Sequence, residues 1–209
     1  ASNQRLKTLL KTELKEDAQK YGDKRRTLII ERREAHAIKE VELTAVEPVT
    51  VVLSAGGWVR AARGHEVDPI GLTYKAGDEF LSAARGKTIH PAIFFDTRGR
   101  SYSLPAHTLA SARGQGEPLT GKLTPSNGAR FLAVIMGLPD QKVLLASDAG
   151  YGFITDIANM VTKNTKGKAM LTVPRDCEPL PPVYVNNYET DYLAAITTEG
   201  RMLVIPVKA

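Results

Sequence analysis

The chain has 209 residues, of which 24% are charged and 43% hydrophobic, a balance typical of one or two globular domains. It has no apolar run near the ~20 residues of a membrane span, and its first residues lack a signal-peptide core. The single cysteine, Cys177, excludes an internal disulfide, and the four dispersed histidines argue against a structural zinc site. We therefore expect a cytoplasmic chain with no metal site and no cofactor of its own.

The net charge of +5 is unevenly placed along the chain. Residues 1–33 carry ten basic and five acidic side chains, and residues 60–173 carry fourteen basic and nine acidic ones. The stretches 34–59 and 174–209 each hold more acidic than basic residues. A polyanion is therefore expected to bind the middle of the body.

An amphipathic helix is expected at the N-terminus. Apolar residues recur every three or four positions, with Lys, Glu and Gln between them: Leu6, Leu9/Leu10, Leu14, Ala18 and Tyr21. Gly22 follows the last of them and predicts the end of the helix.

After Gly22 the pattern changes to short β-branched runs bounded by Gly, Pro, Asn and Asp, which predict strands. The clearest runs are "VTVVLS", "AIFFD", "FLAVIM", "KVLLAS", "DYLAAIT" and "RMLVIPV". No second helical period of comparable length appears, so the body is predicted to be all-β.

Two signatures repeat along this body. A hairpin turn with Gly in fourth place occurs four times, at Gly57, Gly99, Gly150 and Gly200. The second signature is Leu-Thr, predicted to open a further strand, at Leu43, Leu72, Leu123 and Leu171. The period near 50 residues predicts a propeller-like ring of about five four-stranded blades, with residues 27–46 supplying a divergent unit. The alternative is a plain β-sandwich whose hairpins are alike by chance.

Cations beside glycine recur between the hairpins. Arg63, Arg85 and Arg113 are predicted to lie on connecting loops, as is "TKNTKGKA" at 162–169. Equivalent loops of a ring emerge along one rim, where a row of cations would contact phosphates without reading bases. The candidate DNA-binding residues are Arg60, Arg63, Arg85, Lys87, Arg113, Lys122, Lys163, Lys166 and Lys168.

The segment "ELKEDAQKYGDKRRTLI" at 13–29 resembles the end of the coiled-coil region of type IIA topoisomerase A subunits. The repeats that follow resemble the β-pinwheel C-terminal domain of these subunits. The chain lacks the Gln-Arg-Arg-Gly-Gly-Lys-Gly box of gyrase, and "RGHEVDPIGLTYKAGDEFLSAARGKT" at 63–88 is similar to the enterobacterial topoisomerase IV form. The resemblance is therefore to the topoisomerase IV branch, and it covers essentially the whole chain.

The resemblance implies a helical tail at 1–26 and a β-pinwheel at 27–209. It implies non-sequence-specific binding of the transported duplex for ATP-dependent strand passage, in decatenation and supercoil relaxation during chromosome segregation. The holoenzyme would use Mg²⁺ and ATP, would join a B subunit with a second A subunit through an N-terminal region, and would be nucleoid-associated or peripheral at the inner face of the cell membrane.

No tyrosine here has the context of that family's nucleophile, and no P-loop motif occurs, so this chain is expected to hold no catalytic residues. Two alternative functions stay open. One is a platform that docks a condensin-type chromosome organiser, and the other is gyrase-like DNA wrapping.

Overall fold

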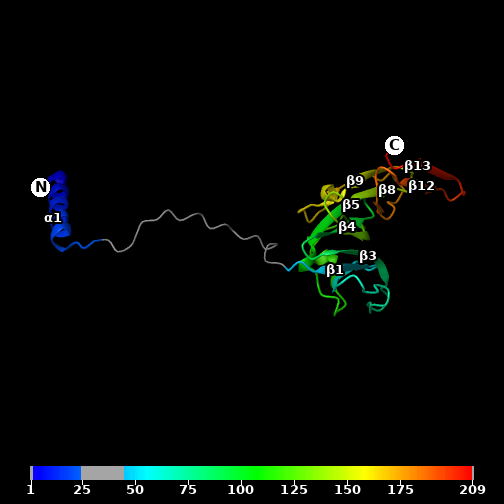
Figure 1. Cartoon of the computed structure of the whole chain (residues 1–209), viewed down its shortest axis with the longest axis horizontal. Coiled ribbons are helices and arrows are strands. Elements are labelled where there is room, and N and C mark those ends of the chain that lie inside the picture. The colour runs from blue at the N-terminus through cyan, green and yellow to red at the C-terminus, as the bar shows by residue number, and fades with distance from the viewer. Residues whose placement is uncertain (1, 25–44, 209) are drawn as a thin grey trace. The chain divides into compact units, whose positions relative to one another are not determined.

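A computed structural model describes residues 2–24 and 45–208 of the chain (Figure 1). Helix α1 spans Asn3–Tyr21, and the Gly22 amide donates to the Ala18 carbonyl at 3.0 Å, so the predicted helix and its end are confirmed. Every residue of α1 is exposed. Within the described ranges no helix is long and apolar enough to cross a membrane. The predicted boundary at 26/27 and nearly all of the divergent unit at 27–46 fall outside the described residues.

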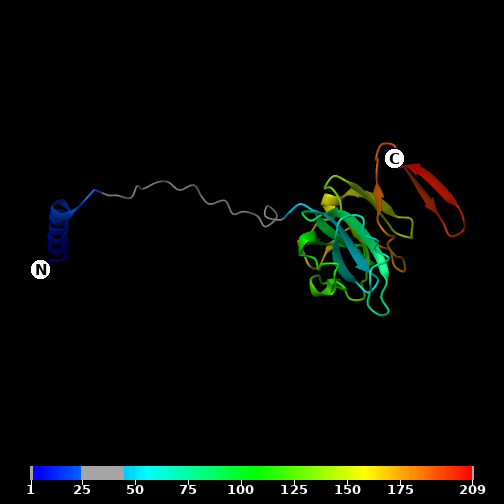
Figure 2. The same cartoon turned by 60° about the horizontal axis from the view of Figure 1, so that its bottom comes forward.

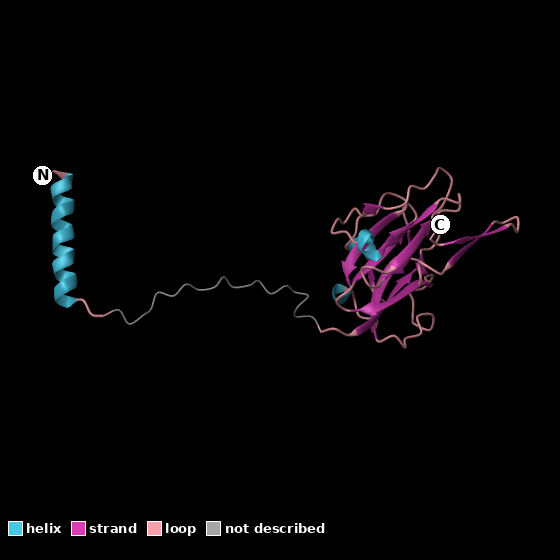
Figure 3. Cartoon of the chain, turned by 45° about the horizontal axis from the view of Figure 1, so that its top comes forward, coloured by secondary structure: helices cyan, strands magenta, loops and turns pink. Residues whose placement is uncertain are grey.

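The described residues from 45 to 208 form four small antiparallel sheets, shown as magenta strands in Figure 3. Sheet I has the order β3 (Phe80–Lys87), β1 (Pro48–Ser54), β2 (Trp58–Arg63), β6 (Glu117–Pro118). Sheet II has the order β10 (Lys168–Ala169), β5 (Arg100–Pro105), β4 (Pro91–Asp96), β7 (Phe131–Ile135). Sheet III is β11 (Val183–Val185), β8 (Lys142–Ala146), β9 (Gly152–Asp156), and sheet IV is β12 (Tyr192–Ile196) with β13 (Met202–Pro206).

Three short helical turns lie in the connections: η1 (Ala106–Thr108), η2 (Leu119–Gly121) and α3 (Ile157–Met160). The six strands predicted from the apolar runs are all present, as β1, β4, β7, β8, β12 and β13.

A hairpin with the same turn lies in each sheet, because the four predicted turn glycines all adopt positive φ, between 71° and 81°. In each turn the glycine amide donates to the carbonyl three residues earlier at 3.0 Å. A Cβ strains this backbone region, which explains the repeated glycine. The hairpin prediction is confirmed.

The prediction that the Leu-Thr signature opens a strand is wrong at its three described copies, and the fourth copy, at Leu43, lies outside the described residues. Leu72, Leu123 and Leu171 lie in loops, and the third strand of each sheet begins several residues later, at Phe80, Phe131 and Val183. Leu123 and Leu171 are buried in the cores between sheets. These leucines recur because the cores need their side chains, not because they join a ladder.

Short strands cross from one repeat to the sheet of the preceding repeat. Strand β6 follows sheet II's hairpin but pairs with β2, and β10 follows sheet III's hairpin but pairs with β5. The two crossings are equivalent, because the Leu119 amide donates to the Gly57 carbonyl and the Met170 amide to the Gly99 carbonyl, both at 3.0 Å. Successive sheets are thereby linked by exchanged strands.

The core is divided between the two faces of sheet II. Phe94 packs with residues of sheet I, whereas its neighbours Ile93 and Phe95 pack with Val143 and Leu145 of sheet III. A strand buried on both faces has an unbroken apolar run, and "AIFF" in β4 has this pattern. Sheet IV contributes no buried residue to either core. The β12–β13 hairpin, orange to red in Figure 2, projects away from the other strands.

Candidate nucleic-acid interface

The sheets meet along one edge and receive the crossing strands along the other. At the first edge, the Val134 amide of β7 donates to Ser82 Oγ of β3 at 3.2 Å. Next to it, the Tyr184 hydroxyl of β11 accepts from the Met136 amide at 3.0 Å. Strands β6 and β10 form the opposite edges of sheets I and II. The loops that lead into these two strands therefore run on the side away from the meeting edge.

We name these connections the crossing loops, residues 106–123 and 157–171. In each, a glycine at positive φ stands directly before the crossing strand: Gly116 at 88° and Gly167 at 72°. An added Cβ would lie 2.4 Å from the Val59 carbonyl oxygen at Gly116, and 2.9 Å from the Ser101 carbonyl oxygen at Gly167. Glycine is required here because the loop backbone lies directly against the preceding sheet.

Five of the nine candidate cations lie on the crossing loops: Arg113, Lys122, Lys163, Lys166 and Lys168. Lys122 Nζ pairs with Glu117 Oε1 at 2.6 Å and donates to the Thr108 carbonyl at 2.8 Å. Lys168 Nζ donates to the Asn159 carbonyl at 2.5 Å. Arg113, Lys163 and Lys166 are exposed, and their side chains bond to no other described residue. These three cations are available to an incoming anion.

Three other candidates lie in strands, so the prediction that Arg63 and Arg85 lie on connecting loops is wrong. Arg85 and Lys87 belong to β3, and Arg63 is the last residue of β2. The Arg63 guanidinium is 3.6 Å from Glu47 Oε2, and its side chain is 87% exposed. Strands β2 and β3 extend as far as Arg63 and Lys87 because both pair with β1, which spans Pro48–Ser54.

Arg60, the ninth candidate, is only 4% exposed and does not lie on the surface. Its Nη1 donates to the Thr73 carbonyl at 2.8 Å and to the Gly114 carbonyl at 3.3 Å, and the guanidinium lies 4.5 Å from the Tyr74 ring. A guanidinium on an aromatic face is favoured by cation–π attraction. Arg60 therefore joins the loop at 64–79 to the first crossing loop, a role that β-strand alternation in the sequence did not reveal.

The hairpin-turn end of the sheets carries charges of alternating sign. Residues that contact the turns are Asp78 and Glu79 at sheet I, Arg130 at sheet II and Glu178 at sheet III. No continuous row of cations forms among these described side chains. The turn contacts therefore offer no uniform positive surface, whereas each crossing loop carries at least one exposed cation without a partner among the described residues.

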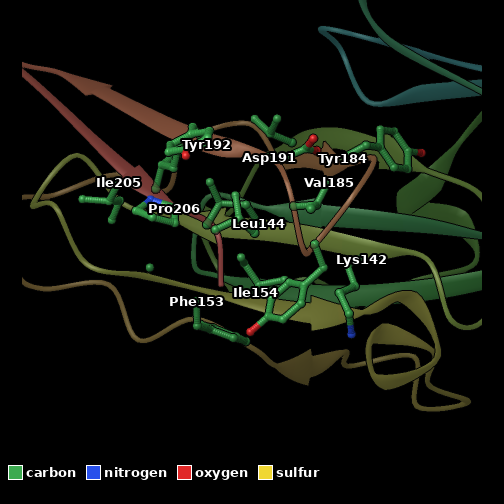
Figure 4. A pocket seen from close by; sticks show the side chains of 15 residues that line it. Lys142, Leu144, Phe153, Ile154, Tyr184, Val185, Asp191, Tyr192, Ile205 and Pro206 are labelled. Atoms are coloured by element: carbon green, nitrogen blue, oxygen red, sulfur yellow. The ribbon is translucent and has the colours of Figure 1, made fainter. Parts of the chain in front are cut away.

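A groove of about 400 Å³ lies between sheet III and the β12–β13 hairpin (Figure 4). Its lining is mainly apolar and aromatic, and includes Leu144, Tyr184 and Tyr192. Lys142 Nζ pairs with Asp156 Oδ1 at 2.7 Å, and this hydrogen bond raises the pKa of the lysine. The described residues that line the groove include no Ser, Cys or His that could act as a nucleophile or base.

The repeated hairpins and exchanged strands match known structures. The C-terminal domain of Escherichia coli ParC superposes with a TM-score of 0.73 and 52% identity, over 78% of this chain and 66% of that one. The C-terminal domain of a DNA topoisomerase IV, at 16% identity, has the same fold, with a TM-score of 0.62 over 78% of this chain and 53% of that one. The protein has the β-pinwheel fold found in the C-terminal domains of topoisomerase A subunits, preceded by one helix, and the predicted fold class is confirmed. In place of the predicted five four-stranded blades, the described residues form four sheets, of which two have four strands.

Sequence comparison gives the same assignment. The A subunit of DNA topoisomerase 4 from Pseudomonas aeruginosa is 52% identical over 206 residues, and that of E. coli K12 is 51% identical over 207. Each match covers 99% of this chain and 27% of the relative, so the chain spans about a quarter of these proteins. No family model matches. The chain is homologous to the C-terminal region of the A subunit of bacterial DNA topoisomerase 4.

Proposed function

We propose that this chain binds duplex DNA without sequence preference, through the free cations of the two crossing loops. The observation that carries the proposal is the equivalence of the loops. Each loop carries a free cation within three residues of its positive-φ glycine, at a different position in the two loops: Arg113 lies three residues before Gly116, beside sheet I, and Lys166 lies directly before Gly167, beside sheet II. Cations at a protein surface bind phosphates by releasing the counterions condensed on DNA, which requires no contact with base edges.

Burial and hydrogen bonding favour some of the candidate cations over others. Arg113, Lys163 and Lys166 are free to contact phosphate, whereas Lys122 and Lys168 would first have to give up protein partners. Arg60 is too buried to reach DNA. Three phosphate contacts predict a slope of about −2.7 for log affinity against log salt, so a fourfold rise in salt weakens binding about 40-fold.

In the whole topoisomerase, this binding would hold the transported duplex for ATP- and Mg²⁺-dependent strand passage, in decatenation and supercoil relaxation. The names of the homologous proteins support membership of a topoisomerase. We place the B subunit, the DNA-cleaving chemistry and the second A subunit in the remainder of such an assembly, and the location at the nucleoid follows from the substrate. The condensin-type partner and gyrase-like wrapping stay predictions from resemblance.

The test is a salt titration of affinity for two duplexes of unrelated sequence. We expect the triple variant Arg113→Gln/Lys163→Gln/Lys166→Gln to lose most of the salt slope, equally for both duplexes, and each single variant to lower the slope by about 0.9. Lys208→Gln is the matched control, because Lys208 lies next to sheet IV and its Nζ already pairs with Glu189. A triple variant that keeps the slope of the parent would show that the crossing loops are not the DNA interface.

A further inference from the structure

A second basic concavity lies at the edge where the sheets meet. This groove, of about 760 Å³, is lined by the end of β3, the segment 136–138 after β7, and Tyr184 and Asn186 at β11. We name it the β3 groove. Its polar lining includes Arg85, Lys87, His65 and His90, and none of its described lining residues is acidic. Buried or concave cations are usually matched by carboxylates, so a lining without them points to an external anion.

The basic groups of the β3 groove have unused hydrogen-bonding capacity. The side chains of Arg85 and Lys87 are exposed and bond to no other described residue. His90 Nδ1 is buried and has no hydrogen-bond partner among the described residues. Burial and the nearby Lys87 lower the pKa of His90, so the imidazole is neutral at pH 7 until a negative charge arrives.

The second imidazole is already oriented. His65 Nε2 lies 2.9 Å from the Gly86 carbonyl oxygen, and because a carbonyl can only accept, Nε2 must carry the proton. The opposite wall is held by Tyr184, whose hydroxyl donates to the Met136 carbonyl at 2.8 Å. Gly86 lies tightly against Met136, since an added Cβ would be 2.7 Å from Met136 Cε. The groove is therefore formed before any ligand binds.

We propose that the β3 groove is a phosphate-binding site. The Arg85 guanidinium supplies the planar pair of donors that fits two phosphate oxygens, and Lys87 supplies a point charge. His90 can gain a proton from solvent and donate to a further oxygen. These donors would occupy all the lone-pair sites of one carboxylate, whereas a phosphate has additional oxygens and carries more negative charge, so phosphate fits better than an acidic side chain.

The phosphate can come from a duplex backbone or from a free anion, and the two sources share the same chemistry. The phosphate-binding site does not depend on the proposed DNA function, but the identification of duplex DNA as the source of the phosphate rests on that function. If the duplex is the source, the chain holds two phosphate-binding surfaces, one on the crossing loops and one where the sheets meet.

The test follows histidine imidazole signals by NMR in the full 209-residue chain during titration with inorganic pyrophosphate or with a short duplex. We expect pyrophosphate to shift the His90 signal and to raise the apparent pKa of His90. Tyr184, His65, Arg85 and Lys87 are the other ionisable groups that line the groove, so a parallel titration of His65 reports on the same anion.

Variants test whether the cations of the β3 groove bind the anion. The variant Arg85→Gln/Lys87→Gln should weaken pyrophosphate binding at least about tenfold, because two charge-assisted hydrogen bonds are lost. Lys208→Gln is the matched control, because Lys208 pairs with Glu189 and does not line the groove, and it should leave pyrophosphate binding unchanged. A duplex that shifts His90 in parent and control shows the backbone as the source, whereas a shift with pyrophosphate alone supports the site with a free anion as the source. The proposal is overturned if neither probe moves His90, or if the double variant binds pyrophosphate as the parent does.

Discussion

Gly116→Ala probes the contact on which strand exchange depends. Gly116 has φ of 88°, and an alanine Cβ would lie 2.4 Å from the Val59 carbonyl oxygen and 3.0 Å from the Val59 carbonyl carbon. Both atoms belong to the backbone of β2, and the next residue, Glu117, pairs with Val59. The collision therefore cannot be relieved by a side-chain rotation, and the loop must move away from sheet I.

The cost has two parts. The left-handed backbone conformation costs alanine about 1–2 kcal/mol, and forcing an extra group into a packed contact costs about 1–3 kcal/mol. Moving the loop also withdraws Leu119, which is fully buried. For a chain of this size each 1 kcal/mol lowers the melting temperature by about 2–4 °C, so we expect a decrease of about 4–20 °C.

Two other glycines provide matched controls in thermal unfolding followed by circular dichroism. Gly64 has φ of 83° with no atom within 4 Å of an added Cβ, so Gly64→Ala isolates the backbone cost. Gly114 lies two residues before Gly116, outside the left-handed region and also in open space, so Gly114→Ala should have little effect. The reasoning fails if Gly116→Ala unfolds at the same temperature as Gly64→Ala.

Two further predictions concern tyrosine hydroxyls that form hydrogen bonds within the fold. Burial, with the hydrogen bond to Asp96, raises the pKa of Tyr102, so the contribution of Tyr102 to stability is complete below the unfolded-state pKa of about 10 and is lost as the pH rises above that value. Urea unfolding should therefore show a decrease in the free energy of unfolding between about pH 9 and pH 11 that is smaller in Tyr102→Phe. Equal decreases in the parent and the variant would contradict this. Tyr184→Phe should lower the free energy of unfolding by about 1–3 kcal/mol in the same assay, because the Met136 backbone loses its hydrogen-bond partner between sheets II and III. Tyr192→Phe, at an exposed ring, is the control and should have almost no effect. Equal effects would exclude this role for the Tyr184 hydroxyl.

The sequence by itself determined the local elements. Helix α1 and the four hairpins were predictable because their hydrogen bonds join residues three or four apart, and the required residue, a glycine at positive φ or an apolar residue at helical spacing, is visible in the sequence. The resemblance to topoisomerase A subunits also rested on contiguous segments, so it could be stated before the fold was known.

Only the tertiary structure decided which strands cross from one repeat to the sheet of the preceding repeat. Strands β6 and β10 are two residues long, too short to show a period, and their partners are more than fifty residues earlier in the chain. The strand prediction at the Leu-Thr pairs failed because the local sequence does not distinguish a leucine buried in a loop from a leucine in a strand.

The roles of the cations were also decided by packing between distant segments. The local sequence does not distinguish Arg60 from Arg113, yet Arg60 links two loops inside the fold and Arg113 is free at the surface. Lys122 is paired because its partner Glu117 is held nearby in β6, the crossing strand that joins sheet I. Composition predicted a basic body, but burial and pairing determine which charges remain available to a phosphate, and both depend on contacts that no local pattern specifies.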